Sequence, residues 1–466
     1  MSSRWTFALV ALAAALGAWV YFGEVRGDVR KQERETAEKH VFGVESAKVT
    51  ALELPLTDNR TARLERDGQN GWKLESPVAY PADPDAVERA LHVLANVQST
   101  ASISPVPSDL LPFGLGPAGQ TVRVFTGPGE PQTLSVGRPT PVGGGRYLSV
   151  GSDSGRIFTV AAGDVFGLMP ALVDLRDKRL TRLSAGAVDD VTVRSGGQLV
   201  ARVKRAESNW LLVEPQPAPG DVEKIQRMLD ELSMARATDF ADTPDAAATA
   251  SLQNPELEIV LHTPEREERL AFGRAGDKTW LERAGDPVLL AVSPAAVSAV
   301  PAKTFDYRAK RVQTLESDQV KALELTWPRA GVTHRFELAE SDWKSAEPGV
   351  ELKPLKVEDM LLAVARLDAT GIEPSGADRK ALGLDPPAVT IRALDAQGKE
   401  LGALSLGDAS PDRGLPAVSS QSGDVWRVSN DLGGTVPLSA EAYTNMFVKV
   451  TPTQAAPPAA QASPEK

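Results

Sequence analysis

Residues 72–97 read WKLESPVAYPADPDAVERALHVLANV, and this stretch decides the fold because it joins a strand signal to a helix signal. Trp72-Lys73-Leu74 follows a turn at 68–71, and alternating apolar and polar residues around such a turn are typical of antiparallel strands. Asp83 then stands where it can cap a helix whose first residue is Pro84. The helix has an apolar stripe with spacings of three and four residues, formed by Val87, Ala90, Leu91, Leu94 and Val97.

The same arrangement occurs twice more. Residues 210–232 read WLLVEPQPAPGDVEKIQRMLDEL, and residues 343–364 read WKSAEPGVELKPLKVEDMLLAV. Successive copies are offset by about 135 residues, which is too long for a solenoid unit and fits a small domain. The second copy keeps its cap as Asp221, but the third has no capping Asp, so we expect the third helix to fray at its start. The stripes comprise Ile225, Met228, Leu229 and Leu232 in the second copy, and Val357, Met360, Leu361, Val364 and Leu367 in the third.

Each copy continues with a leucine before a proline and then with short strands, of which one ends in glycine. These markers are Leu115, Pro117 and Gly137, then Leu252, Pro255 and Gly273, then Leu384, Pro386 and Gly407. Strands of four to six residues with short turns indicate antiparallel pairing, because parallel crossovers need longer connections. The predicted strands are 47–54, 61–66, 72–74, 121–125, 134–136, 146–150 and 157–160 in the first copy, 257–261, 270–272, 279–281 and 288–292 in the second, and 389–391, 404–406, 415–418 and 425–428 in the third. The sequence therefore predicts an α+β fold of tandem antiparallel-sheet modules, each with one principal amphipathic helix.

The length of 466 residues agrees with about three domains. Charged segments at 175–178 and 306–310 lead directly into the next copy, so we expect short, stiff connections between modules. The predicted organisation is an N-terminal transmembrane anchor (1–23), a charged stalk (24–43), repeat modules at 44–180, 181–310 and 311–450, and a disordered tail (451–466).

The segment from Trp5 to Phe22 carries no charge and would make a helix of about 27 Å, enough to cross a hydrocarbon core. A cleaved signal peptide with a small-residue site at 15–17 is the alternative. We favour the uncut anchor, because a cut there would leave the bulky apolar segment 18–22 on a soluble product. The short start before one apolar segment has the layout of an export signal and places the body in the periplasm, although the Lys and Arg residues that follow favour the reverse topology.

Composition narrows the classes of function. The formal net charge is −11 and the isoelectric point is near 5.1, so nucleic-acid binding, which needs a basic face, is not expected. The chain has no cysteine, which excludes disulfides, thiolate metal sites, cysteine nucleophiles and a lipoprotein cysteine.

Three motifs resemble catalytic or phosphate-binding signatures but are better explained as structure. Ser341-Asp342-Trp343-Lys344 matches the spacing of serine–lysine hydrolases. In the first copy, however, Asn70 takes the place of the serine, and a strand would carry the serine and lysine on opposite faces. The glycine clusters 143–145 and 151–155 lack phosphate-loop and nucleophile-elbow residues, so they are predicted turns.

The remaining candidates also have simpler explanations. Asp83 and Asp85 suit a helix start, where carboxylates cap and offset the helix dipole. A metal site would need carboxylates from distant segments to join one of the scattered histidines, which are His40, His92, His262 and His334. Two roles fit the four tryptophans, which are Trp72, Trp210, Trp343 and Trp426: they line a sugar-binding surface or they pack in the core. Packing is favoured because the first three hold equivalent positions. We therefore predict no catalytic, cofactor-binding or metal-binding residue.

Several of these features together resemble the DUF4340 family of membrane-anchored bacterial envelope proteins. The resemblance rests on the apolar N-terminal segment, on Trp72-Lys73-Leu74 before Asp83, and on the glycines Gly137 and Gly407. It rests further on the turns Phe113-Gly114-Leu115 and Leu382-Gly383-Leu384-Asp385-Pro386 and on Leu175-Arg176-Asp177-Lys178. The resemblance covers most of residues 41–448, and the second copy departs from it at 251–255, where no Gly-Leu turn is present.

The resemblance implies an accessory role beside ABC-type transporters of the gliding-motility kind, and it brings no catalytic residues with it. We therefore expect a non-enzymatic, single-pass inner-membrane protein whose periplasmic modules bind or brace a protein partner. Two alternatives are an envelope hydrolase that acts on peptidoglycan or polysaccharide with carboxylates gathered across modules, and a structural spacer without a ligand.

Overall fold

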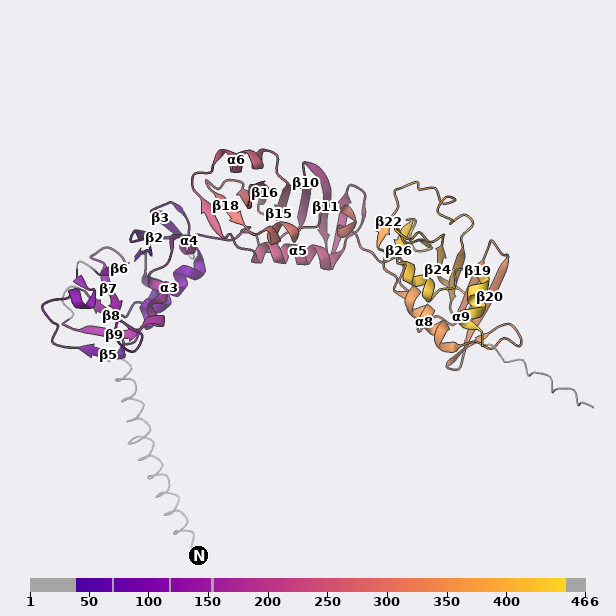
Figure 1. The fold of residues 1–466 in the computed structure, drawn as a ribbon, viewed down its shortest axis with the longest axis horizontal. Helices are drawn as coiled ribbons and strands as arrows, with labels where there is room; N and C mark the ends of the chain where they lie inside the picture. The colour runs from indigo at the N-terminus through magenta and orange to yellow at the C-terminus, as the bar shows by residue number, and fades with distance from the viewer. Residues whose placement is uncertain (1–38, 69–70, 117–118, 152–154, 450–466) are drawn as a thin grey trace, which may run out of the picture. The chain divides into compact units, whose positions relative to one another are not determined.

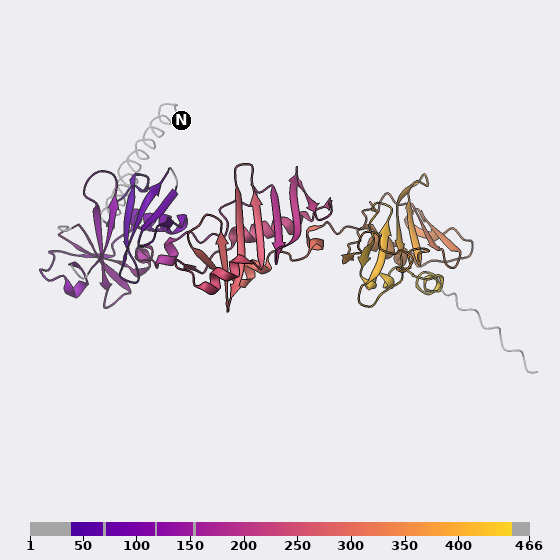
Figure 2. The ribbon, with the colours of Figure 1, turned by 90° about the horizontal axis from the view of Figure 1, so that it is seen from above.

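The computed structural model describes residues 39–68, 71–116, 119–151 and 155–449. Its strands form three antiparallel sheets, each with a principal helix (Figures 1 and 2). The predicted α+β class is confirmed. The predicted anchor (1–23) and tail (451–466) lie outside the described residues, and among the described residues no helix is long and apolar enough to span a membrane.

The first sheet has nine strands in the order β4-β3-β2-β1-β6-β7-β8-β9-β5. Helix α3 (Pro84–Asn96) follows β4 at one edge and precedes β5 at the other, so the chain has to cross a face of the sheet between them. This path explains why one side of α3 is apolar. The strands are β1 (Ala51–Pro55), β2 (Thr61–Asp67), β3 (Gly71–Ser76), β4 (Tyr80–Pro81), β5 (Ala101–Ile103), β6 (Gln120–Phe125), β7 (Gln132–Pro139), β8 (Gly145–Val150) and β9 (Ile157–Ala161).

The second sheet repeats this order as β13-β12-β11-β10-β15-β16-β17-β18-β14, with α5 (Val222–Met234) as the crossing helix. In both views α5 lies along a face of the strands (Figures 1 and 2). The strands are β10 (Asp190–Ser195), β11 (Gln198–Ala206), β12 (Asn209–Glu214), β13 (Ala218–Pro219), β14 (Asp239–Ala241), β15 (Leu257–His262), β16 (Glu267–Ala275), β17 (Lys278–Arg283) and β18 (Leu289–Val292).

The third sheet has eight strands in the order β21-β20-β19-β23-β24-β25-β26-β22, crossed by α8 (Pro354–Ala365). The strands are β19 (Ala322–Trp327), β20 (Val332–Ala339), β21 (Asp342–Ser345), β22 (Gly371–Ile372), β23 (Val389–Leu394), β24 (Glu400–Leu406), β25 (Leu415–Ser419) and β26 (Trp426–Val428). Shorter helices are α4 (Leu172–Leu175), α6 (Ala246–Gln253), α7 (Pro294–Ser298) and α9 (Ala440–Phe447), with 3-10 turns η2 (Ser46–Lys48), η3 (Leu111–Phe113), η5 (Ala162–Leu168), η6 (Thr304–Tyr307) and η7 (Asn430–Gly434).

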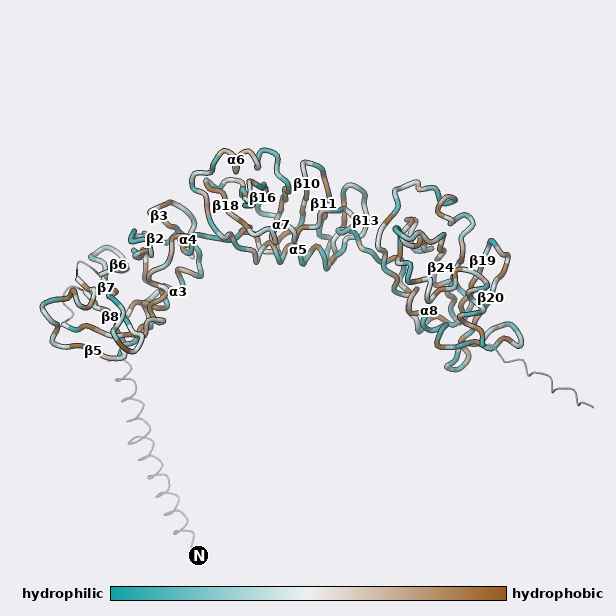
Figure 3. Tube along the Cα trace, viewed as in Figure 1, coloured by the Kyte–Doolittle hydropathy of each residue, from teal (hydrophilic) through white to brown (hydrophobic). Residues whose placement is uncertain are grey.

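The cores lie between each sheet and its helix, and they use the residues that the stripes predict. Leu91 and Leu94 of α3 pack with Leu52 and Leu54 of β1 in the first core. Met360 of α8 lies in the third core. The stripe of α5 is buried in the same way, at Ile225, Met228, Leu229 and Leu232. Hydrophobic and hydrophilic residues, brown and teal in Figure 3, alternate along much of the chain, as one-sided burial requires.

The helix starts confirm the expected difference in capping. The Asp83 side chain accepts a hydrogen bond of 2.9 Å from the Ala86 amide, and Asp221 accepts one of 3.0 Å from the Lys224 amide. Lys353 precedes α8 and makes no side-chain cap. Greater fraying of α8 stays a prediction.

The outward faces of the sheets carry paired charges. In the first sheet, Glu53 accepts hydrogen bonds from Arg63 (3.0 Å) and Arg123 (2.9 Å) on the two neighbouring strands. In the third sheet, Glu324 holds the same position between Arg335 (3.1 Å) and Arg392 (2.7 Å). These faces are therefore charged, with arginines that are partly exposed around a glutamate that is largely covered by them.

One difference from the sequence prediction concerns the end of the predicted stalk, where Val41 and Phe42 are buried in the first core. The departure of the second copy at 251–255 is explained by α6, a helix that replaces the Gly-Leu turn.

By compactness the chain divides into two units, residues 1–182 with 233–253 and 270–296, and residues 183–232 with 254–269 and 297–466. This division does not follow the three sheets, so the predicted module boundaries stay a prediction.

The repeated glycine has a steric cause. A Cβ atom on Gly137 would meet the carbonyl oxygen of Phe113, and one on Gly407 would meet that of Leu382. In the second copy a Cβ on Gly273 would lie 2.6 Å from the carbonyl oxygen of Ser251. The segment that contains the repeated leucine, a turn in the first and third copies and the end of α6 in the second, thus packs directly on the strand backbone, and only glycine leaves room for it.

We predict that Gly137→Ala lowers the free energy of unfolding by about 1–3 kcal/mol, because the added methyl group forces the Phe113 turn away from the strand. Urea unfolding of the full chain measures the change. Gly163→Ala is the matched control, since a Cβ there meets nothing within 4 Å, and its effect should stay within about 0.5 kcal/mol. Equal effects of the two substitutions would contradict the steric explanation.

Candidate functional site

The segment that leaves the first sheet is held on both sides by backbone bridges. Arg176 bridges Ala82 beside the start of α3, and Arg179 bridges Arg236 beyond the end of α5. Residues 177–178 alone separate the two bridges. We call the residues 176–182, with the side chains that contact them, the first junction; all of them belong to the first compact unit.

The second junction, residues 308–311, has the same geometry within the second unit. Arg308 bridges Gly220, and Arg311 bridges Asp368. The corresponding bridge of the third sheet joins Leu352 to Val448, so no arginine stands at this position. The expected short connections are therefore present as segments tied at both ends.

Arg176 is the central side chain of the first junction. Its guanidinium lies over the ring of Phe240 at 4.1 Å and over that of Tyr80 at 4.7 Å. It donates hydrogen bonds of 2.6 and 3.1 Å to the carboxylate of Asp242. The residue is only 2% exposed, and stacking with the bidentate ion pair replaces most of its hydration, while its Nε is buried without a hydrogen-bond partner.

A second arginine, Arg283 at the end of β17, reaches the same junction. It donates to the hydroxyl of Tyr80 (2.9 Å), to the carbonyl oxygen of Arg179 (2.7 Å) and to Asp286 (2.8 Å). The Tyr80 hydroxyl donates to Asp286 at 2.8 Å, and Arg182 donates to the same carboxylate at 3.1 Å. Burial raises the pKa of Tyr80 to about 12; the Arg283 charge opposes this rise, and the Asp286 carboxylate adds to it.

Asp177 anchors the junction from within the connecting segment. Its buried carboxylate accepts hydrogen bonds from Arg179 (2.8 and 3.0 Å) and Arg182 (3.2 Å). Burial opposes ionisation, but these hydrogen bonds and charges outweigh it and lower the pKa of Asp177 below 3.8. The carboxylate therefore stays ionised and paired.

The second junction uses fewer groups. Arg308 pairs with Asp424 and lies 4.8 Å from the ring centre of Trp426. Lys310 donates to Asp221, the cap of α5, at 3.0 Å. Ala309 stands where the first junction has Asp177, so the internal carboxylate is missing.

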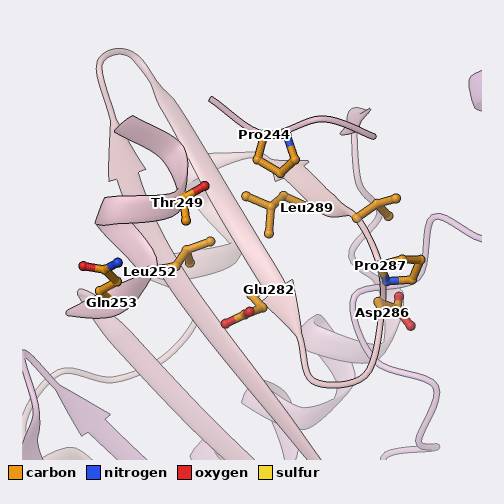
Figure 4. A pocket seen from close by; sticks show the side chains of 9 residues that line it. Pro244, Thr249, Leu252, Gln253, Glu282, Asp286, Pro287 and Leu289 are labelled. Atoms are coloured by element: carbon orange, nitrogen blue, oxygen red, sulfur yellow. The ribbon is translucent and has the colours of Figure 1, made fainter. Parts of the chain in front are cut away.

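A hollow of about 340 Å³ adjoins the first junction at Asp286 (Figure 4). Thr249 and Leu252 of α6 line one side, and Leu289 of β18 lines another. Glu282 and Asp286 add carboxylates to the lining. The remaining lining residues are Pro244, Gln253, Pro287 and Val288.

The structure separates the residues that the sequence singled out. Ser341 lies in the turn before β21, and Lys344 lies in β21, both exposed. Trp343 between them is buried in the third core. Asp153, at the centre of the cluster 151–155, lies outside the described residues.

The histidines lie apart from one another in the described part of the chain. His262 contacts Asp189 at 2.8 Å, and His334 contacts Glu347 at 2.6 Å while stacking on Tyr443 at 4.2 Å. The others are His92, exposed on α3, and His40, which bridges Gln98. Among residues 39–449 as described, no group of three or more histidine or carboxylate side chains is placed to hold a metal ion.

The tryptophans pack, as the sequence analysis favoured. Trp210 and Trp426 are buried, and Trp72 lies half-buried against the first core. Arg66 covers Trp72 at 4.9 Å, and Arg205 covers Trp210 at 4.5 Å.

Sequence reasoning did not identify the junction partners. It named 175–178 and 306–310 only as connections, and it gave no role to Tyr80, Phe240, Asp242, Arg283 or Asp286. The usable signal was the repeated Arg-x-Lys-Arg at 176–179 and 308–311, which holds equivalent positions in two copies.

The comparison with protein families gives one match. The model of DUF4340, a domain of unknown function, matches residues 72–255 and 210–387. Each match begins at a module's tryptophan, Trp72 or Trp210, and continues into the next sheet, so each contains a complete connecting segment. Among curated proteins, none matches the chain.

We predict that Asp286→Ala lowers the free energy of unfolding by about 3–5 kcal/mol, because it leaves the buried guanidinium of Arg283 without its carboxylate. Urea unfolding measures the loss. Asp58→Ala, which removes an exposed pair with Arg60, should cost no more than about 1 kcal/mol. A similar small cost for both would contradict the interpretation that Asp286 neutralises a buried charge on Arg283.

A second prediction concerns pH. Because the pKa of Asp177 is lower in the folded than in the unfolded chain, its ionisation stabilises the fold above the unfolded value of 3.8, and this stability is lost as the pH falls through the folded pKa. Asp177→Asn should therefore destabilise the chain by a constant amount near neutral pH, and the gap to the unsubstituted chain should narrow below about pH 4. Urea unfolding as a function of pH tests this, and a gap that does not change in acid would refute it.

Proposed function

The chain belongs to the DUF4340 family, and from this premise we propose that it is a non-enzymatic scaffold that holds a protein partner in the bacterial envelope. The proposed partner is an ABC-type transporter of the gliding-motility kind. The proposed location is the inner membrane, with residues 1–23 as a single-pass anchor and the three modules in the periplasm.

The observation that carries this proposal is the construction of the two junctions. A connection tied by backbone bridges with two residues between them restrains the segments that it joins. The charge pairs of the buried arginines, Arg176 with Asp242 and Arg308 with Asp424, then favour one arrangement of side chains over others, because any other arrangement leaves a buried charge unpaired. Such restraint suits a protein that holds the segments beside each junction in place for a partner.

The family match supports the same interpretation. Each matched region contains one junction together with parts of both flanking sheets. The family pattern therefore includes the connection as well as the module.

We predict that the full chain, purified by affinity from detergent-solubilised membranes, recovers the subunits of an ABC transporter in fixed proportion. Arg176→Ala should lower that recovery about tenfold, because the first junction loses its central stacked ion pair. Quantitative mass spectrometry measures the recovery, and circular dichroism checks that the sheets persist.

Arg60→Ala, which removes an exposed pair, is the control and should leave recovery unchanged. A purified chain that comes alone and cleaves peptidoglycan or polysaccharide would overturn the proposal in favour of an envelope hydrolase.

A further inference from the structure

Helix α8 has an apolar stripe on its outward side in addition to the stripe that faces the third core. Leu355 is 73% exposed and Leu362 is 57% exposed. Residues seven apart on a helix lie on the same side, two turns apart. Glu358 and Asp359 lie between them on this side and are exposed as well.

The other two principal helices show that the fold does not require these leucines. Leu91, Leu229 and Leu361 hold the same buried place in α3, α5 and α8. With these leucines aligned, the residues equivalent to Leu355 and Leu362 are polar in the other two helices. They are Asp85 and His92 in α3, and Glu223 and Asp230 in α5. The apolar outward stripe is therefore a property of the third module, not of the repeated fold.

The charges on the stripe indicate what can cover it. Lys356 lies 3.4 Å from Asp359 at the margin of the stripe, and both side chains are more than half exposed. Glu358 lies beside Asp359, so the centre of the stripe is acidic. A partner must therefore match two leucines with a negative centre between them.

A second copy of the chain fits this surface poorly. Two copies related by a twofold axis would place the centre of each stripe against the centre of the other. Glu358 and Asp359 would then face their own copies, and such like-charge contacts disfavour association.

We propose that the outward stripe of α8, formed by Leu355, Glu358, Asp359 and Leu362, docks an amphipathic helix of a partner protein. The partner helix carries two apolar residues seven apart, which pack on the two leucines, and Lys or Arg between them, which pair with the acidic centre. This inference deepens the proposed scaffold function and rests on it, since it supplies the face by which a partner is recognised.

The test uses the full chain and a synthetic helical peptide of about 18 residues, with two leucines seven apart, Lys and Arg between them, and an alanine-rich remainder. Fluorescence anisotropy measures its binding. The double variant Leu355→Asp with Leu362→His copies the residues of α3, so it is compatible with the helix, and it should weaken binding at least about tenfold. Leu111→Asp, at another exposed leucine (59%), is the matched control and should leave binding unchanged.

A charge exchange adds a readout that loss of structure would not produce. Glu358→Lys should weaken binding of the basic peptide and strengthen binding of a peptide with Glu in place of its Lys and Arg. Equal binding of the two peptides to the unsubstituted chain would overturn the proposal. So would binding that survives the double variant, or a dimer in sedimentation that depends on Leu355 and Leu362.

The outcomes for the stripe and for the scaffold are separable. Recovery of transporter subunits without peptide binding would overturn the stripe and leave the scaffold. Peptide binding that depends on α8, without recovery of a transporter, would support the stripe and overturn the proposed partner.

Discussion

In each sheet, a backbone hydrogen bond joins the start of the principal helix to the segment through which the chain leaves that sheet. The amide of Asp83 donates to the carbonyl oxygen of Leu175 at 2.9 Å. The amides of Asp221 and Lys353 donate in the same way to the carbonyl oxygens of Tyr307 (2.9 Å) and Phe447 (2.8 Å). The exit of one sheet thereby lies at a fixed place beside its helix, and in the first two sheets the next bridge follows after two residues. So short a connection brings side chains from neighbouring sheets into contact, and the arginine in each junction is the residue that this contact buries.

Buried arginines are costly unless every charge is paired, so they define an arrangement more than they stabilise it. At the first junction, Asp242 pairs Arg176, and Asp286 pairs Arg283. The second junction pairs Arg308 with Asp424 but has Ala309 in place of an internal carboxylate. The two connections thus share a backbone design and differ in the number of charged side chains that surround it.

The sequence predicted the parts of the fold that depend on local pattern. Alternation and turns located strands such as β2, β6 and β15, but β10, β11, β19 and β20 were not predicted, and only part of β16 was; the stripe through Leu91 located α3. Strands of two or three residues such as β4 have no periodic signal, because their pairing depends on the crossing path of the chain. Helix α6 was missed because AAATASLQ has no polar and apolar sides to recognise. The junction partners were out of reach for another reason, since Tyr80 and Asp286 meet across 206 residues of sequence.

Comparison of the three copies also separates residues that build the fold from residues that distinguish one copy. Equivalent core positions carry the same residue, as Leu91 and Leu361 do, because each helix packs on the same kind of sheet face. Outward helix positions carry no such restraint, and polar residues at them cost nothing. Where a copy exposes leucines at these positions, as α8 does at Leu355, the fold gains nothing from them, and exposed apolar surface favours association. In a repeated chain, a recognition surface is therefore to be sought where the copies differ, while the features that they share account for the fold.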